Sequence, residues 1–195
     1  MNDEGALARQ GLSVRVVEEE QEEDVFERWG SLGLAHFSHI DVPAEVLELK
    51  TREDTDDPRL IERLDGASAV YVSGGNPAYL ASILAESDFL DTLVKQLDRG
   101  MAYAGCSAGV ACLNEITFDS DKTDTNEIYQ PGLGIMPGTL FAPHWDIVDT
   151  WMPGAGEFLV GAAPEGYTFI GMDEDTAMIG DGSSWEVLGK SGIHV

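Results

Sequence analysis

Basic residues and long apolar runs are scarce in this chain. Of its 195 residues, 11 are lysine or arginine and 36 are aspartate or glutamate, which gives a net charge of -25 at pH 7. A chain this negative repels nucleic acid and anionic membrane surfaces, so neither is an expected partner. No apolar run of about 18 residues could span a bilayer, and residues 1–4 lack the character of a secretory signal. These absences predict a cytoplasmic protein.

Cysteine and lysine are also rare. The two cysteines, Cys106 and Cys112, suit neither a disulfide framework nor the usual ligand sets of zinc, so we expect two reduced, buried thiols. The few lysines and the excess of acid predict a protein adapted to high salt, where screening relieves self-repulsion. An ordinary acidic cytosolic protein is the alternative interpretation.

Apolar runs alternate with helical patterns along the first part of the chain. Strands are expected at 13–17, 46–49, 69–73 and 101–104. Helices are expected at 25–34, 57–64, 78–84, 89–97 and 110–113. This alternation predicts an α/β fold with a mainly parallel sheet that is covered by helices on both faces. The chain length predicts one domain over 1–195, with residues 1–12 loosely ordered.

The last third changes character, because glycine, proline and aspartate interrupt short apolar runs. Further strands are expected at 140–143, 167–171, 176–179 and 185–188, with a hairpin turn around 181–184. Parallel sheets bind ligands at the carboxyl ends of their strands. Functional residues are therefore expected in the loops that follow the strands.

A G-x-S-x-G pattern is formed by Gly105, Ser107 and Gly109. In a nucleophile elbow, the flanking glycines let a serine occupy a tight turn between a strand and a helix, with its hydroxyl exposed. An apolar strand is expected before this pattern and a helix after it, which is the context that the motif requires. The pattern predicts Ser107 as a nucleophile. A glycine-rich turn with a helix-capping serine is the alternative.

A serine nucleophile needs a base, and the chain offers His36, His39, His144 and His194. His144 is the best placed, because it ends the short apolar run at 140–143, where a functional loop is expected. His36 and His39 lie far upstream and are interpreted as surface or packing residues.

The third member of such a triad is a carboxylate that fixes the tautomer of the imidazole. Asp119, Asp121 and Asp124 all lie between the serine and His144, and their spacing does not choose among them.

An oxyanion hole needs backbone N–H groups that point at one position. Ala108, at the start of the expected helix, supplies one, and its donor strength gains from the helix dipole. Gly75 follows another strand and is the natural second donor, because glycine lets the backbone approach a substrate closely. A plain strand-to-helix turn at Gly74 and Gly75 is the alternative.

Four motifs then occur in a fixed order. They are V-S-G-G-N at 72–76, G-C-S-A-G at 105–109, Pro143-His144, and G-M-D-E-D-T-A at 171–177. Together they resemble the peptidase E and cyanophycinase family of serine peptidases, over roughly residues 13–192. The resemblance implies a flavodoxin-like fold related to the class I glutamine amidotransferases. It also implies hydrolysis of small peptides, such as aspartyl dipeptides or the β-linked aspartyl-arginine of cyanophycin, without a metal or organic cofactor.

The resemblance also assigns roles to residues. It implies Ser107 as nucleophile, His144 as base, and Gly75 and Ala108 as oxyanion donors. The acid is implied to lie within 119–121, and Asp121 is the preferred member, with Asp119 and Asp124 still open.

One departure from the family pattern concerns the start of the chain. Members of the family usually begin with an extra strand and a glycine-rich turn ahead of the strand expected at 13–17, and this chain has no such segment. We expect either a shortened relative or a homodimer in which a second copy covers the exposed edge.

Three other functions are compatible with parts of the sequence. An α/β-hydrolase esterase would pair His194 with Asp173 or Asp175. A non-catalytic relative would bind a small ligand or a partner and hydrolyse nothing. A cysteine hydrolase would use Cys106, but Ser107 takes the exposed place of the motif and Cys106 is expected to point inward.

Overall fold

A computed structural model describes residues 10–14, 23–122 and 127–195 of the chain. These residues divide into two compact units. The first runs up to Gly75 and includes Ile83–Gly105, and the second comprises Asn76–Ser82 and Cys106–Val195. The single domain that chain length predicts stays a prediction, and most of the segment expected to be loosely ordered falls outside the described residues. Nowhere in the described ranges is a helix long and apolar enough to cross a bilayer.

The first unit is built on a parallel sheet with the strand order β2-β1-β3-β4. Its strands are β1 (Gln10–Val14), β2 (Ala44–Leu47), β3 (Ala67–Val72) and β4 (Ala102–Gly105). Each neighbouring pair is parallel. Val72, the last residue of β3, pairs with Gly105, the last residue of β4, so both strands end at the same edge of the sheet.

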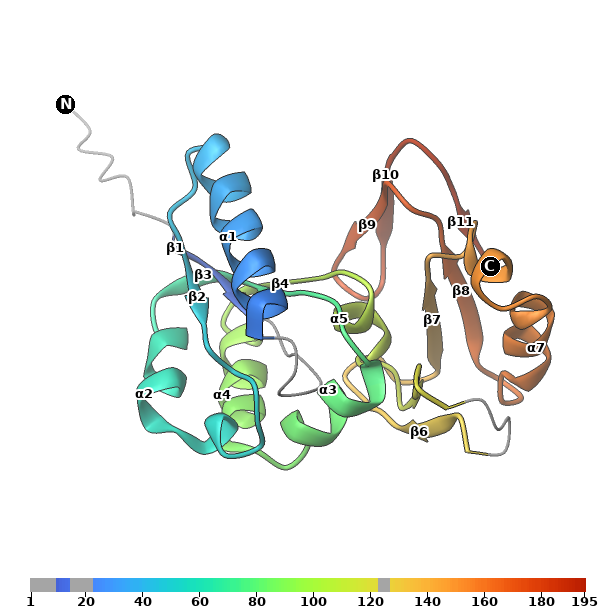
Figure 1. Ribbon diagram of the computed structural model, residues 1–195, viewed down its shortest axis with the longest axis horizontal. Coiled ribbons are helices and arrows are strands. Elements are labelled where there is room, and N and C mark those ends of the chain that lie inside the picture. Colours follow the sequence, from blue (N-terminus) through green and yellow to red (C-terminus); the bar gives the residue numbers. More distant parts are fainter. Residues whose placement is uncertain (1–9, 15–22, 123–126) are drawn as a thin grey trace. The chain divides into compact units, whose positions relative to one another are not determined.

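Helices cover both faces of this sheet. Its helical segments are α1 (Glu23–His39), η2 (Asp54–Asp56), α2 (Pro58–Ile61), η3 (Glu62–Leu64) and α4 (Asp88–Leu97). Figure 1 shows α1 on one side of the strands and α2 and α4 on the other, which is the arrangement that right-handed crossovers produce. α2 begins where Asp57 accepts a hydrogen bond from the N–H of Arg59, with Pro58 in the first helical position. Ser87 caps α4 by accepting from Leu90 at 3.0 Å.

The core of the first unit lies between the sheet and these helices. Its most buried side chains include Leu47, Leu49, Leu64, Val70 and Phe89. The apolar pattern at 25–34 marks α1, as predicted, and Phe26 is the residue of this pattern that is most buried. His36 and His39 are exposed on the same helix, which confirms their interpretation as surface residues.

The described part of the second unit contains three small sheets. The first has the order β11-β8-β7, in which β7 and β8 are parallel and β11 is antiparallel to β8. Its strands are β7 (Thr139–Pro143), β8 (Thr168–Met172) and β11 (Ile193–His194). The other two sheets are antiparallel pairs, β5 (Ile116–Phe118) with β6 (Tyr129–Pro131) and β9 (Thr176–Gly180) with β10 (Trp185–Gly189).

Four short helices complete the described part of the chain. They are α3 (Pro77–Leu84), which begins in the second unit and ends in the first, α5 (Ala108–Ala111), α6 (Val148–Trp151) and α7 (Ala155–Ala162). The α/β fold class is confirmed. The strand predicted at 13–17 overlaps the end of β1, and residues 15–17 lie outside the described ranges.

Candidate active site

Ser107 lies in the two-residue connection between β4 and α5, two residues after Gly105, the last residue of the strand. Its backbone angles are φ 52° and ψ -120°, a combination that residues other than glycine rarely adopt. Strain of this kind persists only where the surrounding structure enforces it, and it is concentrated at functional sites. A strained serine between a strand and a helix is the arrangement that the G-x-S-x-G pattern requires.

The hydroxyl of Ser107 does not cap the helix that follows it. Ser107 occupies the N-cap position of α5, but its side chain makes no capping hydrogen bond. The interpretation of Ser107 as a capping serine is therefore wrong. Ala108 begins α5, and the N–H groups of a first helical turn have no acceptor within the helix. Its amide is the kind of donor that a developing oxyanion needs.

His144 is paired with a carboxylate that the sequence did not single out. Its Nδ1 lies 3.1 Å from Oε1 of Glu174. The register of the sheet explains the pairing, because Pro143 at the end of β7 lies opposite Met172 at the end of β8. Residues that directly follow two paired parallel strands emerge at the same edge of the sheet. The imidazole is 30% exposed and the carboxylate 49%, so both can reach solvent or a ligand.

The segment after β7 and the turn after β8 are held together by several contacts. The N–H of Glu174 donates to Oδ1 of Asp146 at 2.9 Å, and the N–H of Trp145 donates to the carbonyl of Met172 at 3.0 Å. The imidazole of His144 also packs on the indole of Trp151, with 5.0 Å between the ring centroids. These contacts fix the positions of the acid and the imidazole relative to each other.

The choice of ring nitrogen has a chemical consequence. In a serine–histidine–acid triad, the acid binds Nδ1–H and the opposite nitrogen, Nε2, takes the proton of the serine. The contact with Glu174 uses Nδ1 of His144 and leaves Nε2 on the far side of the ring. This pair therefore has the orientation that a general base requires.

Asp119 and Asp121, two of the expected acids, lie around an asparagine. Nδ2 of Asn76 donates to Oδ1 of Asp119 at 2.6 Å and to Oδ2 of Asp121 at 3.1 Å. The Oδ1 atom of the same asparagine accepts from the N–H groups of Ala78 and Tyr79 at the start of α3. The two aspartates thus anchor a buried cap of α3, and the triad role of Asp121 stays a prediction. Asp124 lies outside the described residues.

Gly75, the expected second oxyanion donor, precedes this cap. Its φ is 138°, a conformation that is readily available only to glycine. It lies three residues beyond β3, whose end pairs with the end of β4. Gly75 therefore follows β3 at the edge of the sheet where β4 also ends.

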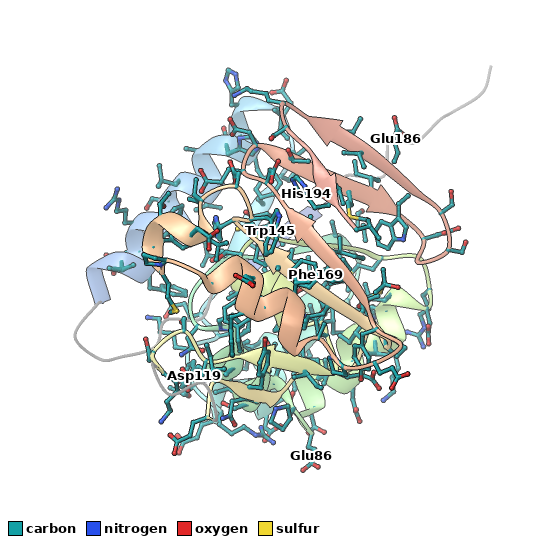
Figure 2. The ribbon with its side chains drawn as sticks, turned by 90° about the vertical axis from the view of Figure 1, so that its right-hand side faces the viewer. Glu86, Asp119, Trp145, Phe169, Glu186 and His194 are labelled. Carbon is teal, nitrogen blue, oxygen red and sulfur yellow. The ribbon has the colours of Figure 1, made fainter. Side chains whose placement is uncertain are left out.

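A second histidine–acid pair lies near the first. Nε2 of His194 is 2.9 Å from Oδ1 of Asp173, whose Oδ2 also accepts from the hydroxyl of Ser191 and the N–H of Gly192. The hydrogen bond from Ser191, followed by the one from His194, lowers the pKa of Asp173 below its ordinary value. Figure 2 shows Trp145 between His194 and Phe169, and the indole stacks edge-on against Phe169 at 4.9 Å. Of the groups in the described ranges, no three histidine, cysteine, aspartate or glutamate side chains are arranged to hold a metal ion.

The chain matches one protein-family model, described as peptidase family S51, over residues 31–188. The chain belongs to peptidase family S51. This match confirms the resemblance to the peptidase E and cyanophycinase family.

Curated relatives of this S51 chain have both names. It is 26% identical over 159 residues to a cyanophycinase from Trichormus variabilis, and 30% identical over 142 residues to a peptidase E from Nostoc sp. (strain PCC 7120 / SAG 25.82 / UTEX 2576). These alignments cover 77% and 69% of this chain, but 52% and 57% of the two relatives. The S51 chain thus spans about half the length of the curated relatives that it matches.

Solved structures show the same fold. The crystal structure of a peptidase from an acI-B1 Actinobacterium matches with a TM-score of 0.83 at 26% identity, covering 94% of this chain and 76% of the other. A putative peptidase E from Listeria monocytogenes EGD-e matches with a TM-score of 0.68 over 96% and 90% of the two chains, at 17% identity. The second likeness concerns the fold alone.

Two sequence-based interpretations of the S51 site need revision. Cys106 is exposed, so the expectation that both thiols are buried is wrong for Cys106 and correct for Cys112. The peptide turns at the neighbouring serine, so the alternation of buried and exposed side chains along β4 does not predict which way Cys106 points. Glu174 was missed as a partner of the imidazole, although the G-M-D-E-D-T-A motif contains it. The signal for Glu174 is its place in the turn after β8, the strand that pairs with β7.

Proposed function

We propose that this S51 chain is a serine hydrolase that cleaves small peptides through Ser107, His144 and Glu174. The observation that carries the proposal is the 3.1 Å contact between Nδ1 of His144 and Oε1 of Glu174, which leaves Nε2 for the proton of the serine. The strained backbone of Ser107 and its uncapped position before α5 support the role of nucleophile. Membership of the S51 family supports a peptide as the substrate.

The proposed reaction is acyl transfer to serine and then to water. Oγ of Ser107 attacks the peptide carbonyl carbon while Nε2 of His144 takes its proton, and the imidazolium gives that proton to the departing amine as the C–N bond breaks. Water then attacks the acyl-serine ester with the same imidazole as base, which releases the acid and restores the serine. Glu174 accepts from Nδ1–H of His144 and thereby holds the imidazole tautomer. The N–H groups of Gly75 and Ala108 are the proposed donors to the oxyanion.

The distribution of charge bears on the substrate. Residues 76–82 and 106–195 contain Lys122 and Lys190 but no arginine, and Lys190 is paired with Asp175 at 2.7 Å. A substrate carboxylate would thus meet few cationic groups in an acidic protein. We therefore propose that neutral and cationic dipeptides are cleaved with a higher kcat/KM than acidic ones. Measuring both classes of substrate tests this, and faster cleavage of Asp-Ala than of Arg-Ala would contradict it.

A fluorophosphonate probe tests for the nucleophile without a known substrate. The folded protein should be labelled, and mass spectrometry should place the adduct on Ser107, because only an activated serine reacts with this probe. Ser107→Ala is the matched control and should not be labelled. Labelling is measured at low and at high salt, because high salt screens the self-repulsion of this acidic protein. Absence of labelling at both would favour the non-catalytic relative.

Separate exchange of His144 and His194 for alanine identifies the base. His144→Ala should abolish labelling, whereas His194→Ala should leave measurable labelling. The reason is that Nε2 of His194 is directed at Asp173, while Nε2 of His144 is not used by its acid. Loss of labelling in His194→Ala alone would instead support the esterase arrangement, in which His194 is the base.

A further inference from the structure

Glu174 stands on a short turn between β8 and β9, and this turn is held from two sides. On one side is the segment at 144–146, which supplies the contacts with His144 and Asp146. A glutamate side chain that is half exposed has several rotamers available, and ordering it costs conformational entropy. Its carboxylate can stay within reach of an imidazole only if the backbone that carries it is fixed.

The C-terminal segment at 190–194 holds the turn from the other side, and Asp173 is its main attachment. The carboxylate of Asp173 accepts from the hydroxyl of Ser191 at 2.7 Å, from the N–H of Gly192 at 3.1 Å and from Nε2 of His194 at 2.9 Å. The N–H of Asp173 donates to the carbonyl of Gly192 at 3.2 Å. The side chain of Asp173 is only 8% exposed. The hydrogen bonds from Ser191, His194 and Gly192 lower the pKa of Asp173 and so favour its charged form.

Two further contacts join the same segment to the same turn. Lys190 donates from Nζ to Oδ2 of Asp175 at 2.7 Å and from its N–H to the carbonyl of Asp175 at 3.0 Å. The N–H of Ser191 donates to Oγ1 of Thr176 at 3.2 Å. Asp175 has a φ of 55°, so this turn keeps a conformation that other parts of the structure must enforce.

The strand pairing of β11 is too short to provide this attachment alone. β11 consists of Ile193 and His194, which pair with Met172 and Gly171 of β8. The side chain of Asp173 therefore matters to this attachment, because it accepts three hydrogen bonds from the segment at 190–194. His194 acts here through the nitrogen that a base would need, which assigns it to this attachment rather than to the serine.

We propose that Asp173 is a positioning residue, which fixes the turn through its hydrogen bonds to Ser191, Gly192 and His194 so that Glu174 meets His144. The inference rests on the proposed function, because it assumes that the pair of Glu174 and His144 activates Ser107. Asp173 touches neither the imidazole of His144 nor the serine in this arrangement, and its effect passes through Glu174.

The test compares Asp173→Asn, Glu174→Gln and the double variant by their rates of labelling with a fluorophosphonate. Asp173→Asn should slow the labelling of Ser107 about 10- to 100-fold, as small displacements of catalytic groups do. In the Glu174→Gln background the same exchange should have little further effect, because both changes remove the same interaction. Asp181→Asn is the matched control. Asp181 also accepts from the N–H and hydroxyl of a serine, Ser183, but does so in the β9–β10 turn, and its exchange should leave the rate unchanged.

Proton NMR provides a second measurement that does not depend on reactivity. The Nδ1 proton of His144, identified by its absence in His144→Ala, should be protected from exchange in the native protein and lost in both Glu174→Gln and Asp173→Asn. If Asp173→Asn fails to fold, Ser191→Ala takes its place. This exchange removes one hydrogen-bond donor to Asp173 and keeps the charge of the carboxylate, so it should weaken the Nδ1 signal of His144.

The outcomes separate the two proposals. A folded Asp173→Asn protein that is labelled as fast as the native protein, or that keeps the Nδ1 signal, would overturn the positioning role. If Asp173→Asn slowed labelling equally in the native protein and in the Glu174→Gln background, the positioning role would also be overturned, because Asp173 would then act independently of Glu174. A native protein that is not labelled but shows the Nδ1 signal, with its loss in Asp173→Asn, would contradict the proposed function and support the positioning role.

Discussion

Two candidate acids, Glu174 and Asp121, differ in the group that each contacts. Glu174 contacts the imidazole of His144, whereas Asp121 contacts the amide of Asn76. Glu174→Gln should lower the rate of serine labelling on the order of 10³–10⁴-fold, because an amide does not select the tautomer that a base needs. Asp121→Asn should change it only slightly, since an amide oxygen can still accept from Asn76. The reverse result would restore Asp121 to the triad.

Gly171 has no side chain, and this leaves room for the indole of Trp145, the residue after His144. A Cβ atom at position 171 would lie 2.7 Å from Cγ of Trp145, closer than carbon atoms approach. Gly171→Ala should therefore destabilise the protein by about 1–3 kcal/mol through overpacking, and slow labelling of the serine by displacing Trp145, the residue after His144. Chemical denaturation and labelling rates measure the two effects.

Gly161 provides the control for this exchange. It lies in α7, and a Cβ atom there would meet nothing within 4 Å. Gly161→Ala should leave labelling unchanged and raise the free energy of unfolding by up to about 1 kcal/mol, because alanine favours a helix. Equal destabilisation by both exchanges would show that contact with the indole is not the cause.

The residues of the candidate site differ in how well the sequence predicts them. Ser107 and His144 stand next to strand ends in recognisable motifs, so local patterns locate them. Glu174 has two acidic neighbours, Asp173 and Asp175, and nothing in the local sequence separates the three. Only the register of β7 and β8 brings the middle one to the imidazole, and the other two contact the C-terminal segment instead.

At the scale of elements, one strand is completed by a side chain. β7 pairs with β8 on one side, and at Phe141 the side chain of Asn114 takes the place of a further strand. Its Oδ1 accepts from the N–H of Phe141 at 3.0 Å, and its Nδ2 donates to the carbonyl at 3.4 Å. Asn114 is fully buried, so it satisfies a backbone segment that water does not reach.

Asn114→Ala should therefore cost stability. The exchange leaves buried backbone groups of β7 without partners, and we expect a loss of about 1–3 kcal/mol in the free energy of unfolding. Gln130→Ala is the control, since this side chain makes one exposed hydrogen bond to a carbonyl, and its loss should stay within about 0.5 kcal/mol. Urea denaturation measures both, and equal stabilities of the two variants would contradict the role of Asn114.

The sequence predicts some elements better than others for a physical reason. β3 is a continuous apolar run, and α4 has apolar periodicity and a clear N-cap. The predicted bounds of both elements agree with the structure to within two residues. β5, β6 and β11 are two or three residues long and were not predicted. α7 was also missed, because its sequence AGEFLVGA contains two glycines, Gly156 and Gly161, and resembles a loop. Such segments depend on contacts that local patterns do not contain.

At the scale of the whole molecule, the net charge of -25 dominates. Raising KCl from about 0.1 M to about 1 M shortens the Debye length from about 10 Å to about 3 Å, which reduces repulsion between exposed carboxylates. We expect the thermal unfolding midpoint to rise over this range, as measured by circular dichroism. An unchanged or lower midpoint would contradict adaptation to high salt.

A charge-reduced variant is the control for this salt effect. Glu27, Glu53 and Glu165 are exposed acids. Their combined exchange for glutamine removes repulsion without touching the site, so the midpoint should be higher at low salt and should rise less as KCl is added. An equal salt dependence in this variant would indicate an effect of the salt on water rather than on charge.

The exposed thiol beside the proposed nucleophile affects how inhibitors must be interpreted. Cys106 is accessible and directly precedes Ser107. Alkylation by iodoacetamide or a maleimide would attach a group one residue from the serine, and the bulk of that group would block the site even where sulfur takes no part in the reaction. Inactivation by such reagents is therefore no evidence for a cysteine peptidase. Diagnostic inhibition should be carried out on Cys106→Ala.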